Sequence, residues 1–236
     1  MAGRKWARAA TAAMFAVWTA MATAMVGTSP VANAQTCPDV EVVFARGTNE
    51  APGVGGVGQA FVDAVRAQAA PRTVGVYAVN YPAGDNFSAR EAFALTVIDG
   101  IRDEANHVQA MAANCPDTRL ILGGYSQGAV VSGFVTSDVV PSSVPAAVAP
   151  QPMPADIAEH VAAVVLFGTP SGPFLSRYQA PAITIGPAYV GKTLQLCAAG
   201  DTICDGAPDG GPTLAHALYS INGMTNDGAR YAVERL

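Results

Sequence analysis

Charged side chains are scarce in this sequence: 13% of its 236 residues are Asp, Glu, Lys or Arg, while 50% are hydrophobic. A chain this apolar has the side chains to bury a core, which argues against disorder. The basic residues number 13 against 18 acidic ones. Because phosphate binding depends on clustered Lys and Arg, nucleic acid is not expected as a partner.

Histidine is rarer still, and the cysteines are widely spaced. The three histidines, His107, His160 and His216, are scattered, and no two cysteines are separated by just two residues. Zinc sites depend on such short spacings. We therefore expect neither a metal nor a cofactor.

The chain starts with the features of a secretory signal peptide. Three basic residues precede an apolar stretch, residues 9–26, and the small-x-small sequence Ala32-Asn33-Ala34 follows. Residues 1–34 are therefore predicted to be a leader that is cleaved on export. The alternative is a retained membrane anchor, since the apolar stretch approaches the roughly 18 to 20 residues that span a bilayer. Cleavage is favoured because a cleavage site follows and no basic stop-transfer cluster does.

Residues 35–236 are enough for a single domain with a substantial core. The leader holds three basic and no acidic residues, so the mature chain has 10 basic against 18 acidic residues and a net charge of −8. We expect a secreted monomer, extracellular or associated with the cell wall, with no obligate protein partner.

All four cysteines follow the leader, and export would place them where disulfides persist. Four cysteines permit three pairings. The short separation of Cys197 and Cys204 favours a local ring, which leaves Cys37 to tie the start of the chain to Cys115.

Short apolar runs alternate with longer helical patterns, as in parallel strands joined by right-handed crossover helices. The runs are almost continuously apolar, so helices should cover both faces of the sheet. The expected strands are residues 40–44, 74–81, 119–123, 161–167 and 193–197. The expected helices are residues 56–69, 88–113, 127–138 and 226–235. These elements predict a three-layer α/β sandwich around a five-stranded parallel sheet, with the proline-rich residues 141–154 as a surface loop.

A nucleophile motif lies where an expected strand meets an expected helix. Gly124-Tyr125-Ser126-Gln127-Gly128 follows the strand of residues 119–123 and opens the next helix. In a nucleophile elbow the Ser occupies a strained turn, and the flanking glycines avoid collisions with the neighbouring strand and helix. Ser126 is therefore the candidate nucleophile, in preference to a solvated Ser in a glycine-rich turn.

A serine hydroxyl needs a base to remove its proton, and His suits that role near neutral pH. The α/β-hydrolase order of Ser, acid and then His excludes His107. His160 precedes the strand at residue 161, at the wrong end of the sheet. His216 lies in a Gly- and Pro-rich loop after the last expected strand, where catalytic loops collect, and is the candidate base.

Three acids, Asp201, Asp205 and Asp209, are near enough in sequence to orient the base. Asp201 is favoured because the bridge between Cys197 and Cys204 would hold it in a stiff ring. A carboxylate that orients a histidine must itself be fixed. Asp205 is the main alternative.

Two loops, residues 81–87 and 206–215, should flank Ser126 at the carboxyl edge of the sheet. Their bulky apolar side chains are Tyr81 and Phe87 in the first and Leu214 in the second. These three residues are expected to bind substrate in a shallow apolar groove.

One motif points to a different class of protein. Gly53-Val54-Gly55-Gly56-Val57-Gly58 satisfies the dinucleotide-binding pattern. However, residues 46–52 separate it from the preceding strand, and no acidic residue caps the next strand. We interpret these glycines as a flexible entry to the first helix.

Together these residues resemble the cutinase family, and more closely its cutinase-like branch from mycobacteria and related actinobacteria. The matching segments cover nearly all of the mature chain. They are Cys37-Pro38-Asp39, Phe44-Ala45-Arg46-Gly47-Thr48-Asn49-Glu50, Gly123-Gly124-Tyr125-Ser126-Gln127-Gly128, the stretch from Cys197 to Cys204 with Gly200-Asp201 inside it, and His216.

The resemblance implies the α/β-hydrolase fold with a five-stranded parallel sheet, the two disulfides paired as above, and a nucleophile exposed without a large lid. It also implies an oxyanion hole made by the backbone N–H of Gln127 and by the backbone and hydroxyl of Thr48. The loop of residues 141–154 looks like the insertion common in the mycobacterial branch.

We therefore expect a secreted serine esterase that hydrolyses short- to medium-chain carboxylic esters through an acyl-serine. Its substrates would be small-molecule or lipid esters, including those at a lipid or polymer surface. The alternatives are an acyltransferase or phospholipase that uses the same triad, and a non-catalytic secreted binding module or antigen.

Overall fold

The computed structural model describes residues 37–236, so the predicted signal peptide lies outside the described residues. Five strands form one parallel sheet in the order β2-β1-β3-β4-β5. The strands are β1 (Val40–Ala45), β2 (Val74–Ala78), β3 (Arg119–Tyr125), β4 (Val161–Phe167) and β5 (Thr193–Leu196). Every residue of β1 and β4 is buried, which fits the wholly apolar sequence of β4 and that of β1 apart from Glu41.

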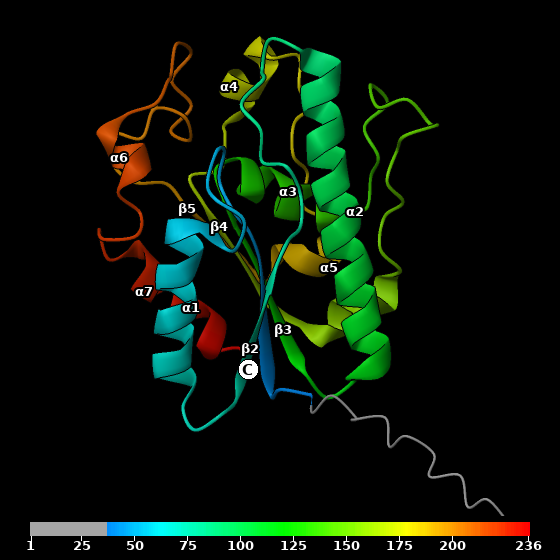
Figure 1. The fold of residues 1–236 in the computed structure, drawn as a ribbon, viewed down its shortest axis with the longest axis vertical. Coiled ribbons are helices and arrows are strands. Elements are labelled where there is room, and N and C mark those ends of the chain that lie inside the picture. The colour runs from blue at the N-terminus through cyan, green and yellow to red at the C-terminus, as the bar shows by residue number, and fades with distance from the viewer. Residues whose placement is uncertain (1–36) are drawn as a thin grey trace, which may run out of the picture. The chain divides into compact units, whose positions relative to one another are not determined.

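Helices cover both faces of the sheet (Figure 1). On one face α1 (Gly55–Ala69) packs against α7 (Met224–Val233), and on the other α2 (Arg90–Asn114) packs against α3 (Gln127–Val135). This arrangement confirms the predicted three-layer α/β sandwich. None of the helices in residues 37–236 is long and apolar enough to cross a membrane.

Four short helices were not expected from the sequence. Each spans at most six residues, too few to show a helical period. They are η1 (Ala155–His160), α4 (Gly172–Arg177), α5 (Pro187–Val190) and α6 (Leu214–Ala217).

The strand order places a candidate site at one edge of the sheet. The chain runs from β1 outward to β2 and then returns to β3 on the other side of β1. Open α/β sheets bind ligands at such a switch point, beyond the carboxyl ends of the strands. The motif around Ser126 follows β3 at that edge.

Two disulfides link the described residues in the pairing favoured by the sequence. Cys37–Cys115 joins the segment before β1 to the end of α2, and Cys197–Cys204 closes a ring after β5. The first stabilises the fold by closing a long loop, and the second fixes a short one.

A buried acid lies between α2, α3 and β3. Glu104 is fully buried, and its Oε2 is 2.9 Å from the Ser132 hydroxyl, which is also 2.9 Å from the Gly123 carbonyl. One hydroxyl proton cannot satisfy both acceptors, so a protonated Glu104 would donate to Ser132, and Ser132 to Gly123. Burial accordingly raises the pKa of Glu104 well above its ordinary value.

Candidate active site

Ser126 lies in the turn between β3 and α3. Its φ of 52° and ψ of −114° place it in a strained backbone region that residues other than glycine rarely adopt. Its N–H donates to the carbonyl of Phe167 at the end of β4, at 2.9 Å, and so holds the turn against the sheet. This is the geometry of a nucleophile elbow.

The glycines on either side of Ser126 have no room for a side chain. A Cβ on Gly124 would lie 2.2 Å from the carbonyl oxygen of Gly128. A Cβ on Gly128 would lie 1.9 Å from the carbonyl oxygen of Ala45 in β1. Both collisions involve backbone atoms, so the Gly-x-Ser-x-Gly spacing is a steric requirement of this turn.

His216 connects Ser126 to Asp201. Its Nε2 is 2.9 Å from the Ser126 Oγ, and its Nδ1 is 2.8 Å from the Asp201 Oδ2. An ionised carboxylate only accepts hydrogen bonds, so Nδ1 carries the proton and Nε2 is free to accept one from Ser126. The Thr213 hydroxyl accepts the N–H of His216 at 3.2 Å and thereby caps the short helix α6.

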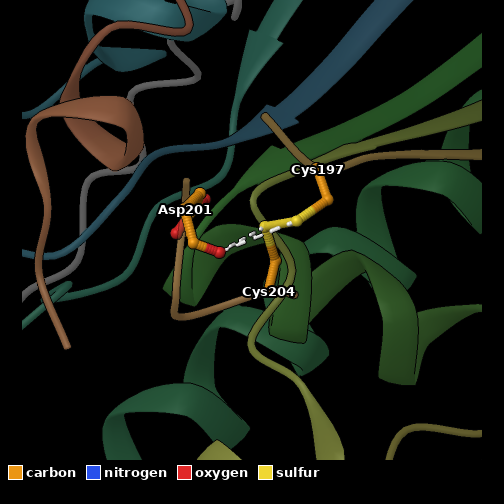
Figure 2. A group of neighbouring side chains, drawn as sticks. All are labelled: Cys197, Asp201 and Cys204. Carbon is orange, nitrogen blue, oxygen red and sulfur yellow. Dashed lines mark hydrogen bonds between the residues drawn. A yellow bond between two sulfur atoms is a disulfide. The ribbon is translucent and has the colours of Figure 1, made fainter. Parts of the chain in front are cut away.

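Asp201 is fully buried within the ring that the Cys197–Cys204 disulfide closes (Figure 2). The main-chain oxygen of Asp201 lies 3.4 Å from Sγ of Cys204, and Oδ1 accepts the N–H of Ile203 at 3.1 Å. Asp205, the alternative acid, is exposed and accepts the N–H of Ala207 instead. The structure therefore brings Asp201, and not Asp205, to His216.

Two tyrosines that sequence reasoning missed hold the triad. The Tyr219 hydroxyl donates to Asp201 Oδ2 at 2.7 Å and accepts the N–H of Ala198 at 2.8 Å. The Tyr125 hydroxyl donates to the carbonyl of His216 at 2.6 Å. Burial, together with the charge of Asp201, raises the pKa of both phenols, so both stay protonated donors. The only sequence signal for Tyr219 is its position three residues after the base.

Replacing Tyr219 with Phe is expected to lower kcat about tenfold with little change in KM. The substitution removes a hydrogen bond to a charged group, worth about 1.5–3 kcal/mol, while substrate contacts stay in place. Steady-state kinetics on a soluble ester would measure the loss. The matched control is Tyr231→Phe, which removes a hydroxyl from α7. Equal kcat in the Tyr219 and Tyr231 variants would show that Tyr219 has no part in orienting Asp201.

The predicted oxyanion residues both adjoin the turn of Ser126. Gln127 is the first residue of α3, and the first N–H groups of a helix have no partner within it. Thr48 lies in the loop after β1. The last residue pair between β1 and β3 is Ala45 with Gly124, so this loop starts beside the turn of Ser126. That loop packs on the elbow, since a Cβ on Gly47 would lie 2.6 Å from the ring of Tyr125.

Tyr81 is not a rim residue, which corrects the expectation from the sequence. Its side chain is 4% exposed, and its hydroxyl donates to the carbonyl of Arg46. The guanidinium of Arg46 in turn donates to the Tyr81 carbonyl at 2.5 Å. β2 ends at Ala78, but Val79 and Tyr81 are still buried, so the apolar pattern continues past the strand. Tyr81 supports the loop that carries Thr48.

Phe87 and Leu214 are placed differently from Tyr81. Leu214 is 74% exposed and lies two residues before His216. The Phe87 ring is half-buried, with its centroid 4.7 Å from that of Phe93 and 5.4 Å from that of Tyr178. Figure 1 shows α6 and α4 beyond the carboxyl ends of the strands. Leu214 is the first residue of α6, and Tyr178 directly follows α4. Leu214 therefore lies at the edge of the sheet that carries the half-buried Ser126, and Phe87 contacts Tyr178 at the same edge.

The other two histidines have partners of their own. His107 on α2 lies 2.8 Å from Oε2 of Glu41, and His160 lies 3.1 Å from the carbonyl of Pro116. Within residues 37–236, the only cluster of three metal-ligand side chains is Cys197, Asp201 and Cys204. Its two sulfur atoms are joined in the disulfide and offer no thiolate.

Comparison with known proteins identifies the family. The family model described as Cutinase matches residues 36–236. The chain is 56% identical over 169 residues to "Probable carboxylesterase Culp7" of Mycobacterium tuberculosis, covering 72% of this chain and 88% of Culp7. It is 44% identical over 225 residues to "Phospholipase Culp4" of the same organism, covering 95% of this chain and 89% of Culp4.

A solved structure agrees with these relatives. Trichoderma reesei cutinase in complex with a phosphonate inhibitor superposes with a TM-score of 0.61 at 30% sequence identity, covering 84% of this chain and 76% of that one. The chain therefore belongs to the cutinase family, to its mycobacterial cutinase-like branch, and is a carboxylic ester hydrolase.

Proposed function

We propose that the protein hydrolyses short- to medium-chain carboxylic esters through an acyl-enzyme formed on Ser126. The observation that supports this most directly is the continuous hydrogen-bond chain from Ser126 through His216 to Asp201. Such a chain lets a histidine take the proton of a serine as the serine attacks, while the buried carboxylate stabilises the resulting imidazolium.

The proposed mechanism has two steps. Ser126 Oγ attacks the ester carbonyl, His216 takes the hydroxyl proton, and the oxyanion is held by the N–H of Gln127 and by Thr48. The alcohol leaves with the proton from His216. Water then attacks the acyl-enzyme with His216 as base, which releases the acid and restores Ser126.

The side chains near Ser126 favour short acyl chains. Phe87 and Leu214 are the apolar residues proposed to contact the acyl group, and Leu214 is largely exposed. Each methylene buried against them contributes at most about 0.8 kcal/mol, and few methylenes can reach them. On p-nitrophenyl esters, kcat/KM is therefore expected to rise from acetate to butyrate or hexanoate and then to level off or fall.

Leu214→Ala tests whether Leu214 contacts the acyl chain. It should flatten the rise with chain length and leave the rate on acetate nearly unchanged, because acetate is too short to contact Leu214. Ile221→Ala, which truncates another exposed apolar side chain, is the control. A rise that continues through palmitate in the wild-type enzyme would contradict the shallow groove and indicate a long acyl tunnel.

Phospholipids are a second candidate substrate, because the relative Culp4 is named a phospholipase. Release of fatty acid from phosphatidylcholine vesicles would test it on the same sample.

We also propose that the enzyme acts outside the cell as a monomer after removal of residues 1–34. Protein recovered from the culture medium should then begin at Gln35.

A further inference from the structure

The glycine-rich run that matches a dinucleotide pattern has a different use in this fold. Residues 53 and 54 precede α1 and residues 55–58 begin it, and the anion at the start of that helix is the side chain of Glu50. Its Oε1 accepts the N–H of Gly56 at 2.7 Å, and its Oε2 accepts the N–H of Gly47 at 2.6 Å. Helix N-termini favour anions, and here the protein supplies its own carboxylate.

The glycines around Glu50 leave space for this carboxylate. Gly55 has a φ of +73°, and a Cβ there would lie 2.2 Å from Oε2 of Glu50. A Cβ on Gly47 would lie 3.2 Å from the same oxygen. Glycine suits position 55 for two reasons: it leaves room for the side chain of Glu50, and it adopts the positive φ without strain.

The carboxylate, the N–H and the carbonyl of Glu50 all form hydrogen bonds. Its carboxylate joins the loop after β1 to α1, its N–H donates to the Gly47 carbonyl at 3.3 Å, and its carbonyl accepts from Nε of Arg46 at 2.9 Å. Arg46 is itself held by the carbonyl of Tyr81. These contacts flank Thr48 and Asn49, and the N–H and hydroxyl of Thr48 are the proposed oxyanion donors.

We infer that Glu50 is a positioning residue for the oxyanion hole, and this inference rests on the proposed function. Its carboxylate fixes Gly47 and thereby aims the N–H and hydroxyl of Thr48 at the developing oxyanion. An oxyanion hole acts on the transition state more than on the bound ester. Loss of the carboxylate should therefore reduce kcat far more than it changes KM.

The experiment is chemical rescue of Glu50→Ala by formate. The substitution is expected to lower kcat on p-nitrophenyl butyrate by about 10- to 100-fold. This loss is no larger than the loss of kcat caused by removing one oxyanion donor. A surface hollow of about 380 Å³, lined by residues 50–56 and Gln59, gives a small anion access to the vacated position. Formate should restore kcat saturably in the variant and have no such effect on the wild-type enzyme.

Two further variants separate positioning from general destabilisation. Val65→Ala truncates a buried side chain of α1 and should lower the melting temperature without a kcat loss that formate reverses. Glu50→Gln retains one hydrogen-bond acceptor. It should lower kcat with little change in KM, and formate should not restore the loss because the amide still fills the position. This variant keeps the test decisive if Glu50→Ala does not fold.

Either of two results would overturn the inference. One is wild-type kcat in a folded Glu50 variant, and the other is a loss in Glu50→Ala that formate leaves unchanged. Failure of the proposed function has a different signature, since the wild-type enzyme would then show no ester hydrolysis that depends on Ser126.

Discussion

Replacing Ser126 with Ala is expected to lower kcat on soluble esters by about a thousandfold or more. The serine is the group placed to form the acyl-enzyme, and without it only binding and the oxyanion donors contribute to catalysis. The fold should persist, because the substitution removes one oxygen from a turn that backbone contacts with Phe167 and the flanking glycines define.

Steady-state kinetics and thermal unfolding on the same preparations would measure both effects. Ser176→Ala, which truncates an exposed serine of α4, is the matched control and should keep full activity. A loss smaller than about a hundredfold in folded Ser126→Ala would exclude Ser126 as the nucleophile.

The second large effect is expected at the acid. Asp201→Asn should lower kcat by roughly 10³- to 10⁴-fold, because an amide that donates to Nδ1 favours the wrong tautomer of His216. The same change would also disturb the hydrogen bond from Tyr219, since one carboxylate oxygen receives both donors. Its structural cost is thus larger than that of Ser126→Ala.

Asp205→Asn is the control for this substitution. Asp205 is exposed and four residues from Asp201, so its amide variant should keep kcat within about threefold of wild type. A severe loss at Asp205 and a mild one at Asp201 would show that the acid has been misassigned.

Elements whose burial is uniform could be predicted from the sequence. β4 was expected at its observed bounds because all seven residues are buried and apolar. The third helix was expected to reach residue 138 but ends at Val135, where the Thr136 hydroxyl bonds back to the Ser132 carbonyl at 3.0 Å. Such side-chain competition with the helix leaves little trace in an apolar pattern.

The chain order and the glycine spacing suggested the triad, but the residues that support it could not be found in the same way. Tyr219 bonds to an acid 18 residues away in the sequence. The carboxylate of Glu50 bonds to the nearby N–H groups of Gly47 and Gly56, but the turn that brings them together leaves no periodic pattern in the sequence. Tyr81 was misplaced because an apolar aromatic at a strand end is compatible with either the rim or the core. Its hydroxyl reaches a carbonyl 35 residues away, and nothing local in the sequence indicates this.

If Ser126 forms the covalent intermediate, a fluorophosphonate should label it, and this labelling is the sharpest test of the proposed mechanism. One phosphonyl group is expected per chain, located on Ser126 by mass spectrometry, and esterase activity should fall in proportion to labelling. Ser126→Ala should take up no label. Labelling at another residue, or full activity in completely labelled enzyme, would exclude Ser126 as the nucleophile.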